Sequence, residues 1–160
     1  MPASLKDMVE LEGYDSTVGM STHGKPLAHD GSIVRILKDA GAVSYAKTNV
    51  PITLLRFESS NGIWGETSNP YNKSYTAVGS TEGEDVLLAL GGRVGIGSDV
   101  AGSVRCPAHF SGCYALKCST GRWLKTGVVT SMPGQDGVPA VYSPMARTLN
   151  DLSHFTRSII

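Results

Sequence analysis

The chain has 160 residues, of which 41% are hydrophobic and 18% are charged, which is ordinary for one globular domain with a sizeable core. Lysine plus arginine and aspartate plus glutamate number 14 each, so the net charge at pH 7 is zero with neutral histidine. This balance argues against a nucleic-acid partner or an anionic membrane surface, both of which attract an excess of basic residues.

The cysteines and the apolar runs limit the other classes. Three cysteines, without a CxxC pair, argue against a disulfide framework and against a zinc site. The opening residues MPASLKDMVELEG contain no apolar stretch typical of a secretory signal. No run approaches the roughly 20 apolar residues that a membrane span needs. We therefore expect a cytoplasmic protein without a membrane span, metal or cofactor.

The first half of the chain predicts alternating helices and strands. Residues 3–9 are typical of a short strand, and residues 42–48 alternate as a second strand does. Between them, apolar residues at helical spacing over 33–40 predict a helix that Asp30 caps and Gly41 ends. The order helix, glycine, strand indicates an α/β sheet covered by helices.

The middle of the chain predicts a long loop before two further elements. Residues 57–79 are polar with interspersed aromatics, and a loop of this length in a compact domain is usually functional or disordered. Residues 84–90 are apolar enough for a helix. Residues 94–99 form a short strand that runs into a turn rich in glycine and serine.

The last part of the chain predicts a strand and a helix. Residues 109–119 are expected to form a buried strand, and residues 148–160 a final helix capped by Thr148 or Asn150. No internal repeat or linker-like change of composition divides the chain. The sequence therefore predicts a single domain over residues 1–160.

Three stretches carry residues suited to chemistry. The first, GIGSDVAGSVRCP, offers the backbone N–H groups of Val100, Ala101, Gly102 and Ser103 among small side chains. A carbonyl oxygen could approach these donors as it does in an oxyanion hole. The alternative is a tight glycine turn between a strand and a helix, with an incidental serine.

The second stretch, AVGSTEGED, places two hydroxyls before a helix start. Ser80 or Thr81 could cap that helix, or the turn could cradle a phosphate. The stretch lacks both the GxxxxGK[ST] and the GxGxxG patterns, which argues against nucleotide binding.

The third stretch is SLKD, which places Lys6 on an apolar strand. Burial of a lysine is costly and lowers its pKa, so a buried Lys6 could act as a base. The alternative is a lysine at a sheet edge or on the surface.

Taken together, these stretches resemble the amidase signature family. The segments VGSTEGE, LLALGG, GIGSDVAGSVRCP and SGCYALKCSTGR are similar to the central motifs of that family. The segments LKDAGAVSYAKTNVP, NGIWGETSNPYN and SMPGQDGVPAVYSPMARTLNDL resemble its flanking parts. The resemblance extends over nearly all of the chain and is closest to the fungal acetamidase and fatty-acid amide hydrolase branch. It implies a mixed twisted sheet covered by helices, incomplete here because family members are several times longer.

The resemblance implies hydrolysis of a small carboxamide or a fatty-acyl amide by a Ser–Ser–Lys triad. Ser103 matches the nucleophile, Ser80 the bridging serine and Lys6 the catalytic lysine, with residues 100–103 around the oxyanion. The family also has a cis peptide before the bridging serine, here the Gly79–Ser80 bond. Lys47 matches a lysine of the helix–strand unit that is not catalytic.

Other polar residues near these motifs are assigned structural roles. Asp99 and Arg105 flank the nucleophile and are expected to hold its turn through a charge-assisted hydrogen bond. Cys106 and Cys113 are expected to be small buried hydrophobic residues. None of the histidines matches a catalytic position of the family; these are His23, His29, His109 and His154.

Three differences from the family pattern bear on activity. Glu82 replaces a glycine, which would strain the backbone at a positive φ, and its carboxylate near Lys6 would raise the pKa of the lysine. Ala101 replaces a glycine in the oxyanion turn. The segment over 91–97 is one residue shorter than in most members and could shift Ser103 relative to the triad.

Two other interpretations stay open. The chain could be a truncated, catalytically impaired amidase-like protein with a binding role or no retained function. An amidotransferase subunit for charged tRNA belongs to the same family but ranks lower, since the chain offers no basic patch. An incomplete fold would leave a sheet edge and an apolar face uncovered, which would favour a homo-oligomer.

Overall fold

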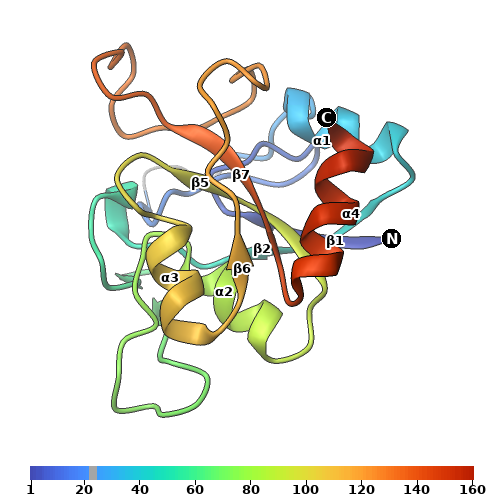
Figure 1. The fold of residues 1–160 in the computed structure, drawn as a ribbon. Helices are drawn as coiled ribbons and strands as arrows, with labels where there is room; N and C mark the ends of the chain where they lie inside the picture. Colours follow the sequence, from blue (N-terminus) through green and yellow to red (C-terminus); the bar gives the residue numbers. More distant parts are fainter. Residues whose placement is uncertain (22–24) are drawn as a thin grey trace.

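The computed structural model describes residues 1–21 and 25–160, so His23 lies outside the described residues. Its centre is a five-stranded sheet in the order β2-β1-β5-β7-β6 (Figure 1). Strand β1 runs parallel to both β2 and β5, whereas β7 is antiparallel to β5 and β6. The predicted mixed α/β sheet is therefore confirmed. The strands are β1 (Pro2–Lys6), β2 (Val43–Thr48), β5 (Val94–Asp99), β6 (Tyr114–Ala115) and β7 (Val141–Ala146).

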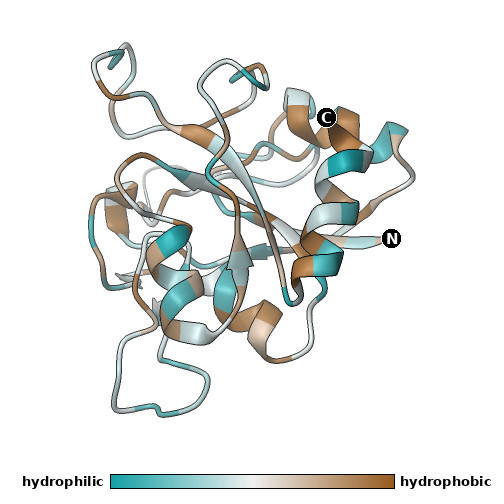
Figure 2. Cartoon of the chain, viewed as in Figure 1, coloured by the Kyte–Doolittle hydropathy of each residue, from teal (hydrophilic) through white to brown (hydrophobic). Residues whose placement is uncertain are grey.

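Helices cover both faces of this sheet (Figure 1). Helices α1 (Ser32–Asp39) and α4 (Leu149–Ile159) pack on one face, where they enclose the larger hydrophobic core. Helices α2 (Glu82–Ala89) and α3 (Arg105–Ser111) cover the other face around a smaller core. Figure 2 shows hydrophobic and hydrophilic residues interspersed along α4, as expected for a helix with one buried face.

Side-chain alternation along β1 gives the sheet two chemically different faces. Ala3 and Leu5 point into the larger core with α1 and α4. Ser4 and Lys6 point to the opposite face, where Ser4 contacts the Glu84 carboxylate of α2 and Lys6 contacts Ser80. The lysine of the strand thus lies beneath the N-terminal end of α2.

Strand β5 presents no side chain to α2 at two positions. A Cβ on Gly97 would lie 2.6 Å from both Thr81 Cγ2 and Val104 Cγ1. A Cβ on Gly95 would overlap the Glu84 carboxylate. Both glycines are needed because the side chains of Thr81, Glu84 and Val104 occupy the space that a Cβ would take.

The segment between β2 and α2 is mostly loop, as expected from its composition. It holds a single turn, η1 (Ile52–Leu54), and a small hairpin of β3 (Ser60–Asn61) and β4 (Gly65–Glu66). The hairpin is fixed by the Asn61 amide, which donates to Asn49 Oδ1 and to the Val50 carbonyl, each at 2.7 Å. The loop thus returns to the end of β2 before it enters α2.

Two details of the sequence prediction are wrong. Asp30 does not cap α1: the N-cap is Gly31, and the Asp30 carboxylate accepts from the Glu12 amide and pairs with Lys38 instead. The buried strand expected over 109–119 is also absent, because its first residues complete α3. Only Tyr114–Ala115 pair with β7, at the edge of the sheet and partly exposed.

At the C-terminal helix α4, Thr148 is the N-cap, one of the two caps predicted, and its side chain accepts a hydrogen bond from the Asp151 amide.

Candidate active site

Lys6 is the centre of a buried polar cluster. Its side chain is fully buried, and Nζ donates to Ser80 Oγ at 2.8 Å, Thr81 Oγ1 at 2.7 Å and Ser98 Oγ at 3.1 Å. The position at the end of β1 brings it against both the start of α2 and the end of β5. An edge or surface position for Lys6 is thereby excluded.

Burial lowers the pKa of Lys6 to about 7, because the charged ammonium loses its hydration and gains only hydroxyl partners. The carboxylates of Glu82, Asp99 and Glu84 act in the opposite direction and offset part of this effect. A lysine with this pKa is substantially neutral near pH 7 and can accept a proton.

The segment that receives Lys6 has an unusual backbone. The Gly79–Ser80 peptide bond is cis, as the family resemblance implies, and Val78 just before it has φ of 66°. The Gly79 amide donates to the Phe57 carbonyl at 2.7 Å, which ties this segment to the wall of the adjacent cavity. Ser80 and Thr81 are both buried and present their hydroxyls to Lys6.

Glu82 begins α2 and its φ is not positive, so the steric cost expected for a side chain there does not arise. The side chain is fully buried. Burial raises the pKa of this carboxyl to about 7. Its charge raises the pKa of Lys6, as predicted from the sequence, but the effect of burial on the lysine is larger.

Asp99 organises the turn that carries Ser103. Its carboxylate accepts from the Gly102 amide at 2.9 Å and the Val104 amide at 3.2 Å, and from Arg105 Nε at 3.0 Å. Burial alone would raise the pKa of Asp99, but Arg105 and the two amides outweigh it and hold the pKa at about 2. The structure therefore supports a structural role for Asp99 and Arg105.

The amides of this turn are not equivalent. The Gly102 N–H donates a hydrogen bond to Asp99 Oδ1. It is therefore not available to bind an oxyanion, although the sequence alone suggested that it would be. Gly102 needs to be glycine, since its φ is 128° and a Cβ there would lie 2.8 Å from Cys106 Sγ. Ala101, in contrast, has no positive φ and its side chain is exposed, so it fits where the family has glycine.

A cavity of about 220 Å³ joins the two halves of the candidate site. Ser80, Ser98 and Ser103 line it together with the turn residues Val100 and Ala101. The remaining wall is largely apolar and consists of Met8, Leu54, Leu55, Arg56, Phe57, Thr130, Ser131, Met132 and Ala140. The structure thus brings the two predicted serines to one cavity, with Lys6 directly behind Ser80.

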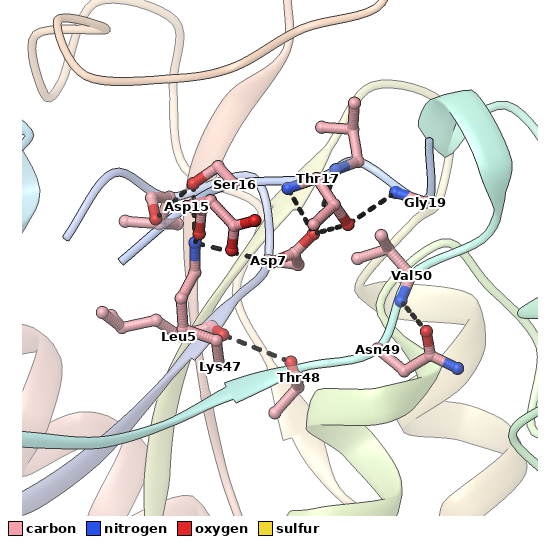
Figure 3. A network of polar contacts seen from close by, with 12 residues as sticks. Leu5, Asp7, Asp15, Ser16, Thr17, Gly19, Lys47, Thr48, Asn49 and Val50 are labelled. Atoms are coloured by element: carbon pink, nitrogen blue, oxygen red, sulfur yellow. Dashed lines mark hydrogen bonds and ion pairs between the residues drawn. The ribbon is translucent and has the colours of Figure 1, made fainter. Parts of the chain in front are cut away.

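Lys47 belongs to a separate polar network, drawn in Figure 3. Its Nζ donates to Ser16 Oγ at 2.6 Å and to the Asp15 carbonyl, and lies 3.5 Å from Asp7 Oδ1. The other oxygen of Asp7 accepts from the Thr17 amide at 2.9 Å and from its hydroxyl at 2.7 Å. Lys47 lines a different cavity of about 400 Å³, to which none of the three candidate triad residues contributes.

Sequence reasoning missed two neighbours of the lysine, Thr81 and Ser98. Their hydroxyls are the other two acceptors of Lys6 Nζ. The available signal was that Thr81 directly follows Ser80 and that Ser98 lies near the end of β5. The expectation that Cys106 and Cys113 are buried is wrong, since both are half-buried. The described histidines, His29, His109 and His154, are exposed.

Across residues 1–21 and 25–160, no group of three or more His, Cys, Asp or Glu side chains is placed to hold a metal ion. None of the helices in these ranges is both long and apolar enough to cross a membrane.

Comparison with known proteins places this geometry in a family. The chain is 44% identical to "Amidase 1" of Gibberella moniliformis over 164 residues, spanning 100% of this chain and 31% of that protein. It is 40% identical to "Acetamidase" of Emericella nidulans over 162 residues, spanning 100% of this chain and 30% of that protein. The chain therefore spans about a third of the length of these relatives.

A solved structure and a family description agree with these relatives. The structure of a "Fatty acid amide hydrolase" superposes with a TM-score of 0.92 at 36% identity, covering 100% of this chain and 28% of that one. The family described as Amidase matches residues 1–160. The match over the whole chain shows that this protein belongs to the Amidase family.

Proposed function

We propose that the protein hydrolyses amides with Ser103 as nucleophile, Ser80 as bridge and Lys6 as base. The observation that carries the proposal is the 2.8 Å hydrogen bond from a fully buried Lys6 to Ser80, which shares a cavity with Ser103. The pKa of Lys6, about 7, supports a neutral amine at physiological pH.

In the proposed reaction, neutral Lys6 takes a proton from Ser80 as Ser80 takes one from Ser103. Ser103 Oγ then attacks the amide carbonyl carbon, and the oxyanion is held by the amides of Val100, Ala101 and Ser103. The proton returns through Ser80 to the leaving nitrogen as the C–N bond breaks. Water attacks the acyl-enzyme by the same route and releases the carboxylic acid.

The cavity favours an uncharged substrate. Apart from Arg56, its wall beyond the serines consists of apolar and hydroxyl side chains. A volume of about 220 Å³ suits a small carboxamide or a short acyl group. The name of the relative called acetamidase agrees with a small carboxamide. A fatty-acyl amide, as named for the fatty acid amide hydrolase, would extend beyond this cavity.

A catalytically impaired, amidase-like protein is the second candidate. The buried Glu82 carboxyl favours it, because an ionised Glu82 raises the pKa of Lys6 and so weakens the proposed base. Exposed apolar side chains such as Trp64 and Leu124 also support self-association into a homo-oligomer.

Labelling with a fluorophosphonate distinguishes the two candidates. We expect the probe to modify Ser103 of the folded protein, as located by mass spectrometry, and Ser103→Ala to abolish the adduct. Ser98→Ala is the matched control, since Ser98 lines the same cavity but should still permit labelling. Absence of an adduct on Ser103, together with no hydrolysis of a panel of primary and N-acyl amides, would support the impaired protein.

A further inference from the structure

Three carboxylates raise the pKa of Lys6, and two of them, Asp99 and Glu84, have hydrogen-bond partners. Burial still raises the pKa of Glu84 to about 7, whereas the partners of Asp99 lower its pKa. Asp99 accepts from two amides and pairs with Arg105 and Lys117. Glu84 accepts from the Ser4 hydroxyl and, at 2.9 Å, from the Thr48 hydroxyl. The third, Glu82, is fully buried, and neither of its oxygens has a hydrogen-bond partner among residues 1–21 and 25–160.

The position of Glu82 favours an uncharged carboxyl. Its two oxygens lie 2.5 Å and 2.9 Å from the point where a Cβ on Gly79 would stand, and the Arg56 carbonyl oxygen lies 2.9 Å from the same point. A carbonyl oxygen repels a carboxylate but can accept a hydrogen bond from a carboxylic acid. The exposed Glu58 adds a further negative charge nearby.

Few groups favour the charged form of Glu82. The buried Ser59 hydroxyl favours the charged form of Glu82 most, followed by the backbone N–H of Glu82 itself and by Lys6. Burial outweighs all three, so the pKa of Glu82 is raised to about 7, in the same range as that of Lys6. Two groups that interact and titrate together share their protons as a pair.

We propose that Glu82 is a positioning residue that sets the charge of Lys6: as a neutral buried acid it leaves the lysine a free base. When the proton resides on Lys6 Nζ and Glu82 is ionised, two opposite charges are buried and the base is unavailable. One proton moves and no other bond changes. The inference rests on the proposed function, and it assigns to Glu82 a brake on the same reaction.

The pH dependence of Ser103 labelling tests this proposal in the intact chain. In the wild type, labelling should rise over two overlapping steps as pH increases, because full deprotonation of Lys6 requires both members of the pair to titrate. Glu82→Gln keeps the shape of the side chain without its charge, so the rise should lose one step and shift by about one pH unit to lower pH. Glu66→Gln is the control, since it removes an exposed carboxylate that acts on neither Glu82 nor Lys6, and it should leave the profile unchanged.

A second measurement does not depend on activity. With ¹³C-labelled glutamate, the side-chain carboxyl resonance that disappears in Glu82→Gln should titrate near pH 7 rather than in the ordinary acidic range. An acidic titration of Glu82, or equal profiles for wild type and Glu82→Gln, would overturn the proposal. Labelling that fails at every pH would refute the proposed function, whereas the titration would still decide the charge of Glu82.

Discussion

Lys6 and Lys47 lie on neighbouring strands of one sheet, only one register position apart, yet their surroundings differ in kind. In the pairing of β1 with β2, Leu5 lies opposite Lys47 and Lys6 opposite Thr48. Lys6 is fully buried and meets only hydroxyl groups. Lys47 is less deeply buried, and the Asp7 carboxylate lies 3.5 Å from its Nζ (Figure 3).

The comparison teaches that the partner decides what a buried lysine can do. Burial lowers the pKa of both lysines. At Lys47 the Asp7 carboxylate opposes burial most strongly, and the pair anchors the loop that follows β1. At Lys6 the direct hydrogen-bond partners are neutral, so no carboxylate in contact stabilises the charged ammonium. The amine can therefore exchange a proton.

Replacement of each lysine by methionine gives the largest expected contrast. Lys6→Met should reduce labelling of Ser103 and amide hydrolysis by about 10³-fold or more, because it removes the proposed base. Lys47→Met should retain activity per folded molecule, since Lys47 contacts neither the cavity of Ser103 nor the triad. The rates are measured at pH 8 with the folded fraction checked by circular dichroism. Equal losses in the two variants would remove Lys6 from its special role.

The pH dependence of stability separates the two lysines next. The pKa of Lys6 falls from 10.5 to about 7 on folding, so between these values the folded state binds fewer protons than the unfolded state. The free energy of unfolding should therefore rise with pH between 7 and 10.5, by about 1.4 kcal/mol per unit. Below pH 7 both states bind the proton and this dependence ends. Relative to Lys6→Met, the wild type should gain about 2–3 kcal/mol from pH 7.5 to 9.5 in urea unfolding. Parallel curves for the two proteins would contradict a buried, deprotonated Lys6.

The ion pair of Lys47 should make a smaller contribution that is purely structural. Lys47→Met leaves the buried Asp7 carboxylate without its cation and should cost about 2 kcal/mol in the free energy of unfolding. Adding Asp7→Asn to Lys47→Met should recover part of this loss, because the uncompensated charge is removed while the amide oxygen can still accept from Thr17. Urea unfolding of the single and double variants measures the coupling, and strictly additive losses would argue against an interacting pair.

Removal of one serine hydroxyl that accepts a hydrogen bond from each lysine gives the smallest expected contrast in rate. Ser98→Ala deletes one of the three acceptors of Lys6 and should lower the rate of hydrolysis about tenfold, as expected for one modest hydrogen bond. Ser16→Ala deletes the matching acceptor of Lys47 and should leave the rate unchanged. A rate loss in Ser16→Ala as large as in Ser98→Ala would show that the two networks are coupled.

Much of the fold follows from local sequence patterns, but two elements do not. Strands β2 and β5 and helix α4 form where alternation and helical spacing predict them. Helix α3 is short and contains Pro107, which is tolerated only because it lies in the first turn. Strand β7 contains Pro144 opposite Ile96, and a proline within a run argues against a central strand.

The candidate site likewise contains features that the sequence predicts and features that only the folded structure reveals. The motifs around Ser80 and Ser103 were visible because they are contiguous in sequence. The burial of Lys6 and its contacts with Thr81 and Ser98 depend on the packing of α2 against the sheet, which no local pattern specifies. The engagement of the Gly102 amide by Asp99 likewise arises only once the turn has folded.

The missing side chain at Gly97 has a consequence for how this site could change under mutation. Gly97 separates Thr81, which contacts the lysine, from Val104, which follows the candidate nucleophile. A single added methyl group would push these two residues apart. Since they adjoin Ser80 and Ser103, the distance between the two candidate catalytic serines would increase with them. A library of variants at this position should therefore retain almost no function even where the protein still folds. The absence of a side chain at Gly97 would then restrict the substitutions tolerated at this site as strictly as the proposed reacting side chains do.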